Sequence, residues 1–352
     1  MGDRSKKRIK WIDVCKGIGM ILVILGHCAY FGGVLHNYIF TFHMPLFFLL
    51  SGLFFNANQI RNVVTRKAKS LILPYVSFSI LGLIMTIAIP SWRNNYSLKG
   101  FIYDIYMGSP DYINVSSIWF LMCLFVTMLL MALILKIQSK KIQYIVLALL
   151  VLLGVGFAYI HEKIPYLPGR RLPFDIDVAM ISVLFFGIGY YFKNSINKIS
   201  SCNNFILIGI FACLSFALWG VVCINGRVNL HGLTFNNILL YVTGAILGSL
   251  MLMALSVIVS RVNMLEKMFA WIGRNTISIL GLQAIYVRLF VLLINAIKKQ
   301  SYQLYYLPSE YVLVSFVFVL IMSVITTIIF NPINRQVKNA IIKQKDSTKF
   351  NS

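Results

Sequence analysis

Long apolar runs, separated by short polar connections, follow one another along almost the whole chain. A run of about 15–25 apolar residues is long enough to cross a bilayer as a helix. The chain contains ten such runs, and it is therefore predicted to be all-α, a polytopic membrane bundle in which residues 1–335 form one domain. The predicted spans are Val14–Phe31, Tyr38–Phe55, Ser70–Pro90, Ile118–Leu135, Ile142–Ile160, Val178–Phe192, Phe205–Ile224, Phe235–Val259, Thr276–Ile297 and Tyr311–Phe330.

The distribution of Lys and Arg between the spans predicts the orientation. If the N-terminus is inside, the connections on the cytoplasmic side hold 22 of these residues and those on the outer side hold 8. Cytoplasmic connections of membrane proteins are enriched in positive charge. Both termini are therefore predicted to be cytoplasmic, with residues 336–352 as a basic cytoplasmic tail of a multi-pass plasma-membrane protein.

Composition agrees with a membrane protein. Of the 352 residues, 59% are hydrophobic and 12% are charged, whereas a soluble domain carries about 25% charged residues. The net charge of +22 would suit nucleic acid, but the basic residues lie in short runs between spans, so no nucleic-acid partner is expected. The six cysteines form no CxxC pair, and neither a disulfide framework nor a metal site is predicted.

Four ionisable side chains inside predicted spans are the first candidates for function. They are Lys16, His27, His43 and Arg288. Such groups are costly in a bilayer and usually face a cavity or a partner.

Lys16 and His27 are eleven residues apart. In a helix this separation is three turns plus about 20°, with a rise of about 16.5 Å, so both side chains lie on one face. A long anionic donor can rest its phosphates near Lys16 while His27 removes a proton from an acceptor hydroxyl. The other interpretation is structural, with Lys16 extending to the lipid headgroups and His27 bonding between helices.

Two blocks near the N-terminus are specific. The first is Lys16 followed by ten residues and then His27, and the second is FHMPLFF at Phe42–Phe48, followed by Ser51-Gly52. Together they resemble the acyltransferase 3 family of integral-membrane O-acyltransferases, most closely its fucose 4-O-acetylase-like branch. Many members have Arg where this chain has Lys16, so the charge is kept but the bidentate guanidinium is not.

Weaker similarities to the same family extend along the chain. They are Arg66–Lys69, Trp119–Leu121, Pro173–Asp177 with the FFGIG segment after it, and Gly273–Leu280. Relatives often have His shortly after the last block, where this chain has Gln283. A role that requires a titrating group at that position is therefore not expected here.

The resemblance implies transfer of an acyl group, usually acetyl, from cytoplasmic acyl-CoA to a carbohydrate hydroxyl. The acceptor would be a cell-surface glycan or its lipid-linked precursor, and His27 would be the catalytic base. Acetyl-CoA would be a donor substrate, with no permanently bound cofactor. The expected partners are acyl-CoA, the carbohydrate acceptor and membrane lipid.

Three basic residues are candidates for binding the donor phosphates: Lys16, Arg66 and Lys69. All three are predicted on the cytoplasmic side, where CoA is found. A basic connection also binds anionic lipid, and for Arg66 and Lys69 this alternative is equally open.

Five residues are candidates for binding the acceptor, and most have a structural alternative. His43 precedes Pro45, which disturbs helical bonding and leaves carbonyls to satisfy. The two aspartates can instead be helix N-caps, and the arginine can form a buried structural pair. The candidates are His43, Trp119, Asp175, Asp177 and Arg288.

Other functions remain open from the sequence. A translocator of polysaccharide or lipid-linked sugar would need broken helices and a large central pathway, and His27 would then matter little. An acyltransferase with a non-sugar acceptor would use the same site.

Overall fold

The computed structural model describes residues 9–28, 33–56, 60–93, 97–108, 115–164, 171–299, 301–302 and 307–330. The structure is 86% helical and has no strand among these residues. A single β-bridge joins Asn229 and Thr234. The predicted all-α membrane bundle is confirmed.

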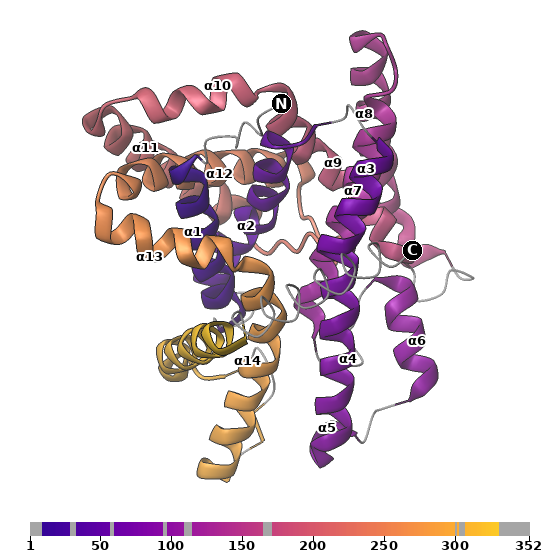
Figure 1. The fold of residues 1–352 in the computed structure, drawn as a ribbon, viewed down its shortest axis with the longest axis vertical. Helices are drawn as coiled ribbons and strands as arrows, with labels where there is room; N and C mark the ends of the chain where they lie inside the picture. The colour runs from indigo at the N-terminus through magenta and orange to yellow at the C-terminus, as the bar shows by residue number, and fades with distance from the viewer. Residues whose placement is uncertain are drawn as a thin grey trace, which may run out of the picture.

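Figure 1 shows the helices in chain order, from indigo at the N-terminus to yellow at the C-terminus. Residues Ser309–Phe330 form the last helical segment, called the C-terminal helix below. The labelled helices are α1 (Lys10–Cys28), α2 (Val34–Leu53), α3 (Ile60–Lys67), α4 (Leu73–Ala88), α5 (Pro90–Arg93), α6 (Leu98–Met107), α7 (Trp119–Ile134), α8 (Lys140–Ile160), α9 (Ile176–Tyr191), α10 (Lys193–Asn197), α11 (Asn204–Asn225), α12 (Ile238–Ser260), α13 (Asn263–Arg274) and α14 (Thr276–Lys298).

Within the described residues, each predicted span overlaps one helix or helical segment. Residues 29–31 at the end of the first predicted span, and the predicted tail 336–352, lie outside the described residues. Nine helices in the described part of the chain are long and apolar enough to cross a membrane. The remaining span, predicted at Ile118–Leu135, is the 16-residue helix α7, which is only about 24 Å long. The 3₁₀ turn Ser116–Ile118 precedes α7 and adds about 6 Å, so together they reach the ~30 Å of a hydrocarbon core.

Several boundaries differ from the prediction by a few residues: α1 begins at Lys10 and α2 at Val34, four residues before the predicted Val14 and Tyr38. One of the differences has a clear local reason. The eighth span is predicted to begin at Phe235, whereas α12 begins at Ile238. The side chain of Asn237 accepts hydrogen bonds from the backbone N–H groups of Leu239 and Leu240. This N-cap satisfies amides that the helix leaves free, and it fixes the start of α12.

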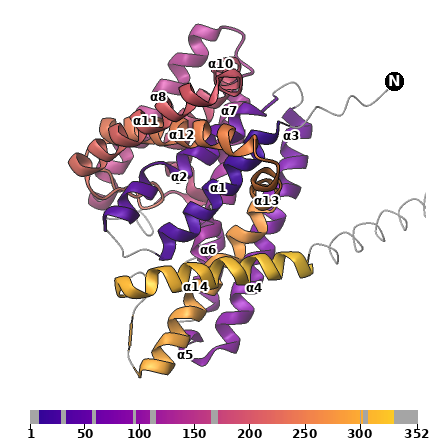
Figure 2. The same ribbon diagram turned by 90° about the vertical axis from the view of Figure 1, so that its left-hand side faces the viewer.

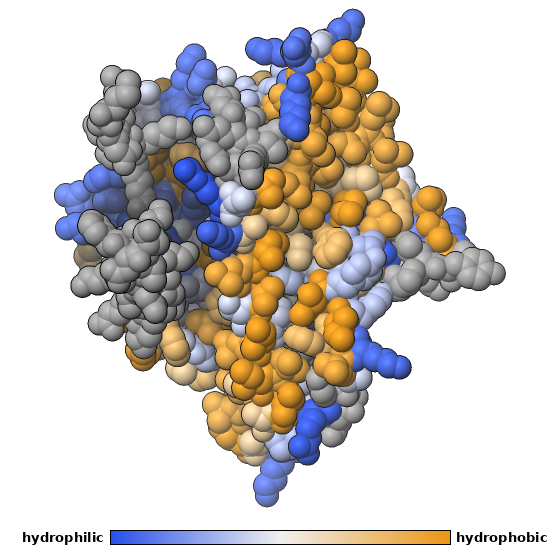
Figure 3. Space-filling model, turned by 45° about the vertical axis from the view of Figure 1, so that its right-hand side comes forward, coloured by the Kyte–Doolittle hydropathy of each residue, from blue (hydrophilic) through white to orange (hydrophobic). Residues whose placement is uncertain are grey.

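Burial separates inner helices from outer ones. Within 18-residue windows, 67% of α1 is buried inside the protein, against 6% of the α8 segment. Figure 3 shows that the face carrying α4 and α8 is covered largely by apolar side chains. A face of this kind suits contact with lipid, whereas α1 lies in the protein interior.

Two pairs of glycines bring inner helices into backbone contact. A Cβ on Gly17 would lie 2.0 Å from the carbonyl oxygen of Phe269, and a Cβ on Gly273 would lie 1.8 Å from that of Asp13. This pair joins α1 to α13. A second reciprocal pair, Gly52 and Gly189, joins α2 to α9 in the same way. Small residues permit such close approach between membrane helices.

Connections predicted on the same side of the membrane lie at the same end of the molecule. Figures 1 and 2 place α10 and α3 toward one end and α5 at the other. We expect single cysteines introduced into the connections Asn56–Lys69 and Ser91–Ser117 to react with membrane-impermeant reagent from opposite faces, the first from the cytoplasm. Labelling of both connections from outside intact cells would show that the span assignment is wrong.

Candidate functional site

One face of α1 carries a stripe that begins with Lys16 and ends with His27. Met20 and Val23 lie between them, four and seven residues after Lys16, and therefore on the same helical face. Lys16 and His27 are both half-buried, whereas Met20 and Val23 are buried. The predicted common face of Lys16 and His27 is thus part of an inner helix.

Helix α2 runs antiparallel beside this stripe and contacts both ends of it. The Lys16 ammonium lies 5.3 Å from the centroid of the Phe54 ring at the end of α2. At the other end, the rings of His27 and Phe40 meet edge to face at 5.6 Å. Contact of Lys16 with an aromatic face stabilises the cation, and it places Lys16 at the C-terminal end of α2. This end is predicted to be cytoplasmic.

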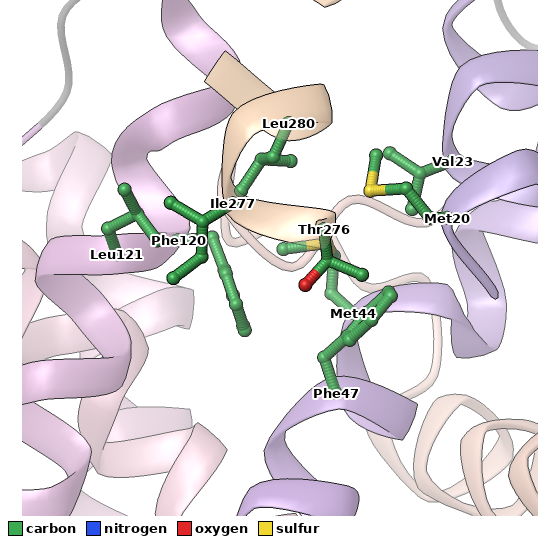
Figure 4. Close-up of a pocket in the computed structure, with 9 residues that line it drawn as sticks. All are labelled: Met20, Val23, Met44, Phe47, Phe120, Leu121, Thr276, Ile277 and Leu280. Carbon is green, nitrogen blue, oxygen red and sulfur yellow. The ribbon is translucent and has the colours of Figure 1, made fainter. Parts of the chain in front are cut away.

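A small cavity of about 30 Å³ lies between the two ends of the stripe. Its surface is apolar, and four helices contribute to it (Figure 4). The volume is enough for water but not for a pantetheine arm. Two of the lining side chains, Met20 and Met44, are methionines, which are flexible and can move to enlarge the cavity. The lining residues are Met20, Val23, Met44, Phe47, Phe120, Leu121, Thr276, Ile277 and Leu280.

Three imidazoles surround the ring of Phe40, and we call this group the histidine cluster (His27, His36, Phe40, His43). His36 stacks on Phe40 with centroids 3.8 Å apart, and His43 lies 4.7 Å from it. Nδ1 of His43 is 2.9 Å from the carbonyl oxygen of Ile39. Because a carbonyl only accepts, His43 donates here, which leaves its Nε2 as the acceptor.

The donor candidates Arg66 and Lys69 are on a different element from Lys16. Arg66 lies in the last turn of α3, and Lys69 lies in the π-helical turn Ala68–Ile72 that joins α3 to α4. Both side chains are exposed. Their predicted role in binding donor phosphates stays a prediction.

A second polar group, the outer cluster (Trp119, Arg171, Asp175, Asp177, His231), gathers at the start of α9. Arg171 donates to Asp177 at 2.6 Å through Nε and to Asp175 at 3.2 Å through Nη2. Nε2 of His231 lies 3.5 Å from Oδ1 of Asp175, and its ring stacks on Trp119 with centroids 4.5 Å apart. The structure thus brings together Trp119 and both aspartates, and it adds Arg171 and His231.

The outer cluster is held by strong charge pairing. Burial by itself would lower the pKa of Arg171, but the hydrogen bond and charge of Asp177, with the charge of Asp175, raise that pKa above its ordinary value. The guanidinium therefore stays charged. Asp177 is fully buried and also accepts the backbone N–H of Leu172 and of Val178. Breaking such a buried pair typically costs about 3–5 kcal/mol, so the cluster supports the fold.

The capping role considered for Asp175 is wrong. Asp175 occupies the N-cap position of α9, but its side chain makes no capping hydrogen bond. Its backbone has φ 54°, and that of Phe174 has φ 58°, a left-handed conformation that is uncommon outside glycine. This turn directs the carboxylate to Arg171 instead. In the described part of the chain, Oδ2 of Asp175 is buried without a hydrogen-bond partner.

The connection between α11 and α12 contributes to the outer cluster. It is closed at its base by Asn225, whose Oδ1 accepts the backbone N–H of Asn237 at 2.9 Å. It places His231 in the outer cluster. The sequence left His36 and His231 without a role, because no local motif marks either of them.

Helix α14 contributes Gln283, which is fully buried. Neither polar atom of its amide has a hydrogen-bond partner among the described residues. Gln283 follows the cavity residue Thr276 by seven positions, so both lie on one helical face. Arg288 lies five positions further on, about 140° around the helix. Its predicted acceptor-binding role stays a prediction.

The comparisons with known proteins give one match. The acyltransferase 3 family model, described as an acyltransferase domain, matches residues 9–330 and so includes every element of both clusters. The match identifies the family and not the branch within it. Comparison with curated proteins and with solved structures gave no match. The chain, with its helical bundle and nearly end-to-end match, belongs to the acyltransferase 3 family and is a membrane acyltransferase.

Proposed function

We propose that this protein moves an acyl group, acetyl in the first instance, from cytoplasmic acetyl-CoA to a hydroxyl of a cell-surface glycan or lipid-linked saccharide. The observation that carries the proposal is the stripe on α1. A cation at the cytoplasmic end of α2, an apolar cavity and a histidine cluster follow one another along a single face. This order matches the parts of the donor: phosphates, pantetheine arm and thioester.

In the proposed reaction His27 acts as general base. It removes the proton of the acceptor hydroxyl as the oxygen attacks the carbonyl carbon of the acyl group. The new C–O bond forms, the bond to the leaving group breaks, and the proton returns to that group, which departs as the CoA thiol in direct transfer. The same base serves transfer through an acyl-enzyme.

The small cavity on the α1 stripe limits how the acyl group can reach His27. At about 30 Å³, it admits the donor arm only if its side chains move. Met20 and Met44 have the unbranched, flexible side chains that such movement needs. A translocator must pass a whole sugar, which requires far larger rearrangement of the same four helices.

The test of the proposed function uses protein reconstituted in lipid vesicles. Acetyl-CoA labelled in the acetyl group is supplied on one side, with surface glycan or lipid-linked saccharide from cells lacking the protein as acceptor. We expect label in alkali-labile ester linkage to the saccharide. Saccharide that crosses the vesicle membrane in the presence of the protein but carries no labelled ester would favour the translocator instead.

Removing the positive charge of Lys16 is expected to weaken the binding of acetyl-CoA. Lys16→Ala removes the cation that lies over Phe54, and the loss should be smaller at high salt, because salt screens charge interactions. Lys16→Arg keeps the charge and should be tolerated. The measurement is the Kd for acetyl-CoA of each variant and of Arg66→Ala and Lys69→Ala. Unchanged Kd values in all three alanine variants would contradict the predicted phosphate site.

A further inference from the structure

A polar cavity of about 550 Å³ opens where α2, α7, α8, α9 and α10 end or begin. Its volume is in the usual range for a small-molecule site, about 300–1,000 Å³. The connections that form it are those predicted to be cytoplasmic. The lining residues are Phe54, Phe55, Asn56, Leu135, Lys140, Gln143, Tyr190, Tyr191, Lys193 and Asn194.

The lining of this cavity combines positive charge with aromatic rings. Lys140 and Lys193 are its two charged residues, and no acidic residue lines it. The residues are accessible, since Lys140 is exposed and Lys193 is half-buried. Two lysines without a lining carboxylate favour an anionic ligand, and aromatic faces stack on flat rings such as those of nucleobases.

Hydrogen bonds hold one wall of the cavity in place. The hydroxyl of Tyr191 donates to Oε1 of Gln143 at 2.9 Å, and Nε2 of Gln143 donates to the carbonyl oxygen of Ile137 at 2.6 Å. The ring of Tyr190 lies against Tyr191 with centroids 5.2 Å apart. The aromatic wall is therefore fixed before any ligand binds, which lowers the entropy cost of binding.

Phe54 connects this cavity to the stripe on α1. Its ring lines the cavity and also lies 5.3 Å from the ammonium of Lys16. A ligand held in the cavity by its phosphates therefore has Lys16 at the inner edge. From there Met20 and Val23 lead along α1 to His27.

We propose that this cavity binds the nucleotide end of the acyl donor, with Lys140 and Lys193 contacting its phosphates. The inference rests on the proposed function for the identity of the donor, and it replaces Arg66 and Lys69 by Lys140 and Lys193 as the principal partners of Lys16. The pantetheine arm then extends past Lys16 toward the histidine cluster. Arg66 and Lys69 do not line the cavity.

The experiment compares Lys140→Ala/Lys193→Ala with Lys141→Ala in phosphatidylcholine vesicles. Lys141 is the neighbour of Lys140 in α8, is also exposed and does not line the cavity. We expect the Kd for acetyl-CoA, measured by calorimetry, to rise about tenfold or more in the double variant, as for the loss of charge-assisted contacts. It should change less than about twofold in Lys141→Ala, where only distant charge is lost. Equal Kd values in the double variant and the wild type would overturn the proposal.

A second donor separates the nucleotide site from other effects of the substitutions. S-Acetyl-pantetheine has the same thioester and lacks the nucleotide, so kcat/KM with this donor should be unchanged in the double variant. An equal loss with both donors overturns the proposal. A loss that appears only when anionic lipid is added to the vesicles also overturns it, because the cavity would then bind lipid phosphate. If the wild type binds acetyl-CoA through these lysines but transfers no acetyl group, the result supports the nucleotide site and contradicts the proposed function.

Discussion

Replacement of His27 by alanine is expected to reduce O-acetylation to about 10⁻²–10⁻⁴ of the wild-type rate, the usual cost of losing a positioned acid–base group. His27 lies at the outer end of the α1 stripe, beside Phe40 and beyond the apolar cavity. The protein should still insert and fold, because the substitution removes a polar group from a membrane-spanning helix. The measurement is the acetyl content of surface glycan at matched levels of protein and glycan.

A histidine outside the site provides the control for this variant. His161 lies at the end of α8, where its Nδ1 is 2.9 Å from the carbonyl oxygen of Ala158. His161→Ala makes the same chemical change away from both clusters and should leave acetylation unchanged. Normal acetylation in His27→Ala would remove His27 from the mechanism and would favour the translocator. A silent His161 variant beside an inactive His27 variant would exclude a general effect of losing a histidine.

Substitution of Gly273 by alanine is expected to destabilise the bundle strongly. The new Cβ would lie 1.8 Å from the carbonyl oxygen of Asp13, and this atom is backbone and cannot turn aside. Helix α1 must therefore move away from α13, which also displaces Lys16. Overpacking of a close-packed interior typically costs about 1–3 kcal/mol and occasionally more. The expected result is a lower melting temperature and less folded protein in the membrane.

The same substitution at Gly220 separates packing from helix propensity. Gly220 is in α11, and a Cβ there would meet no heavy atom within 4 Å. Because alanine favours a helix over glycine by about 1 kcal/mol, Gly220→Ala should be neutral or slightly stabilising. Opposite signs for the two variants are therefore predicted. A melting temperature for Gly273→Ala equal to that of Gly220→Ala would contradict the close contact of α1 with α13.

Only part of the candidate site could be predicted from the local sequence. The common face of Lys16 and His27 follows from their spacing in one helix, and the structure keeps it. The spacing does not predict which residues Lys16 and His27 contact, because their partners Phe54 and Phe40 come from α2. Lys140 and Lys193 begin α8 and α10, and His231 lies in the connection between α11 and α12. No motif marks any of them, and only the meeting of several chain segments places each in its site.

The sequence by itself determined the helical fold and the apolar segments, because hydropathy over about 20 residues and a 3.6-residue period are local properties. The ten spans and the candidate base His27 are its predictions. The tertiary structure decided which helices touch. Gly17 and Gly273 set one backbone contact between helices, and Gly52 and Gly189 set another. Their effect depends on the partner backbone opposite each of them. In a bilayer, apolar side chains gain little by contacting another helix instead of lipid, because lipid is equally apolar. The shape of the helix surfaces and their polar contacts therefore decide which helices pack together.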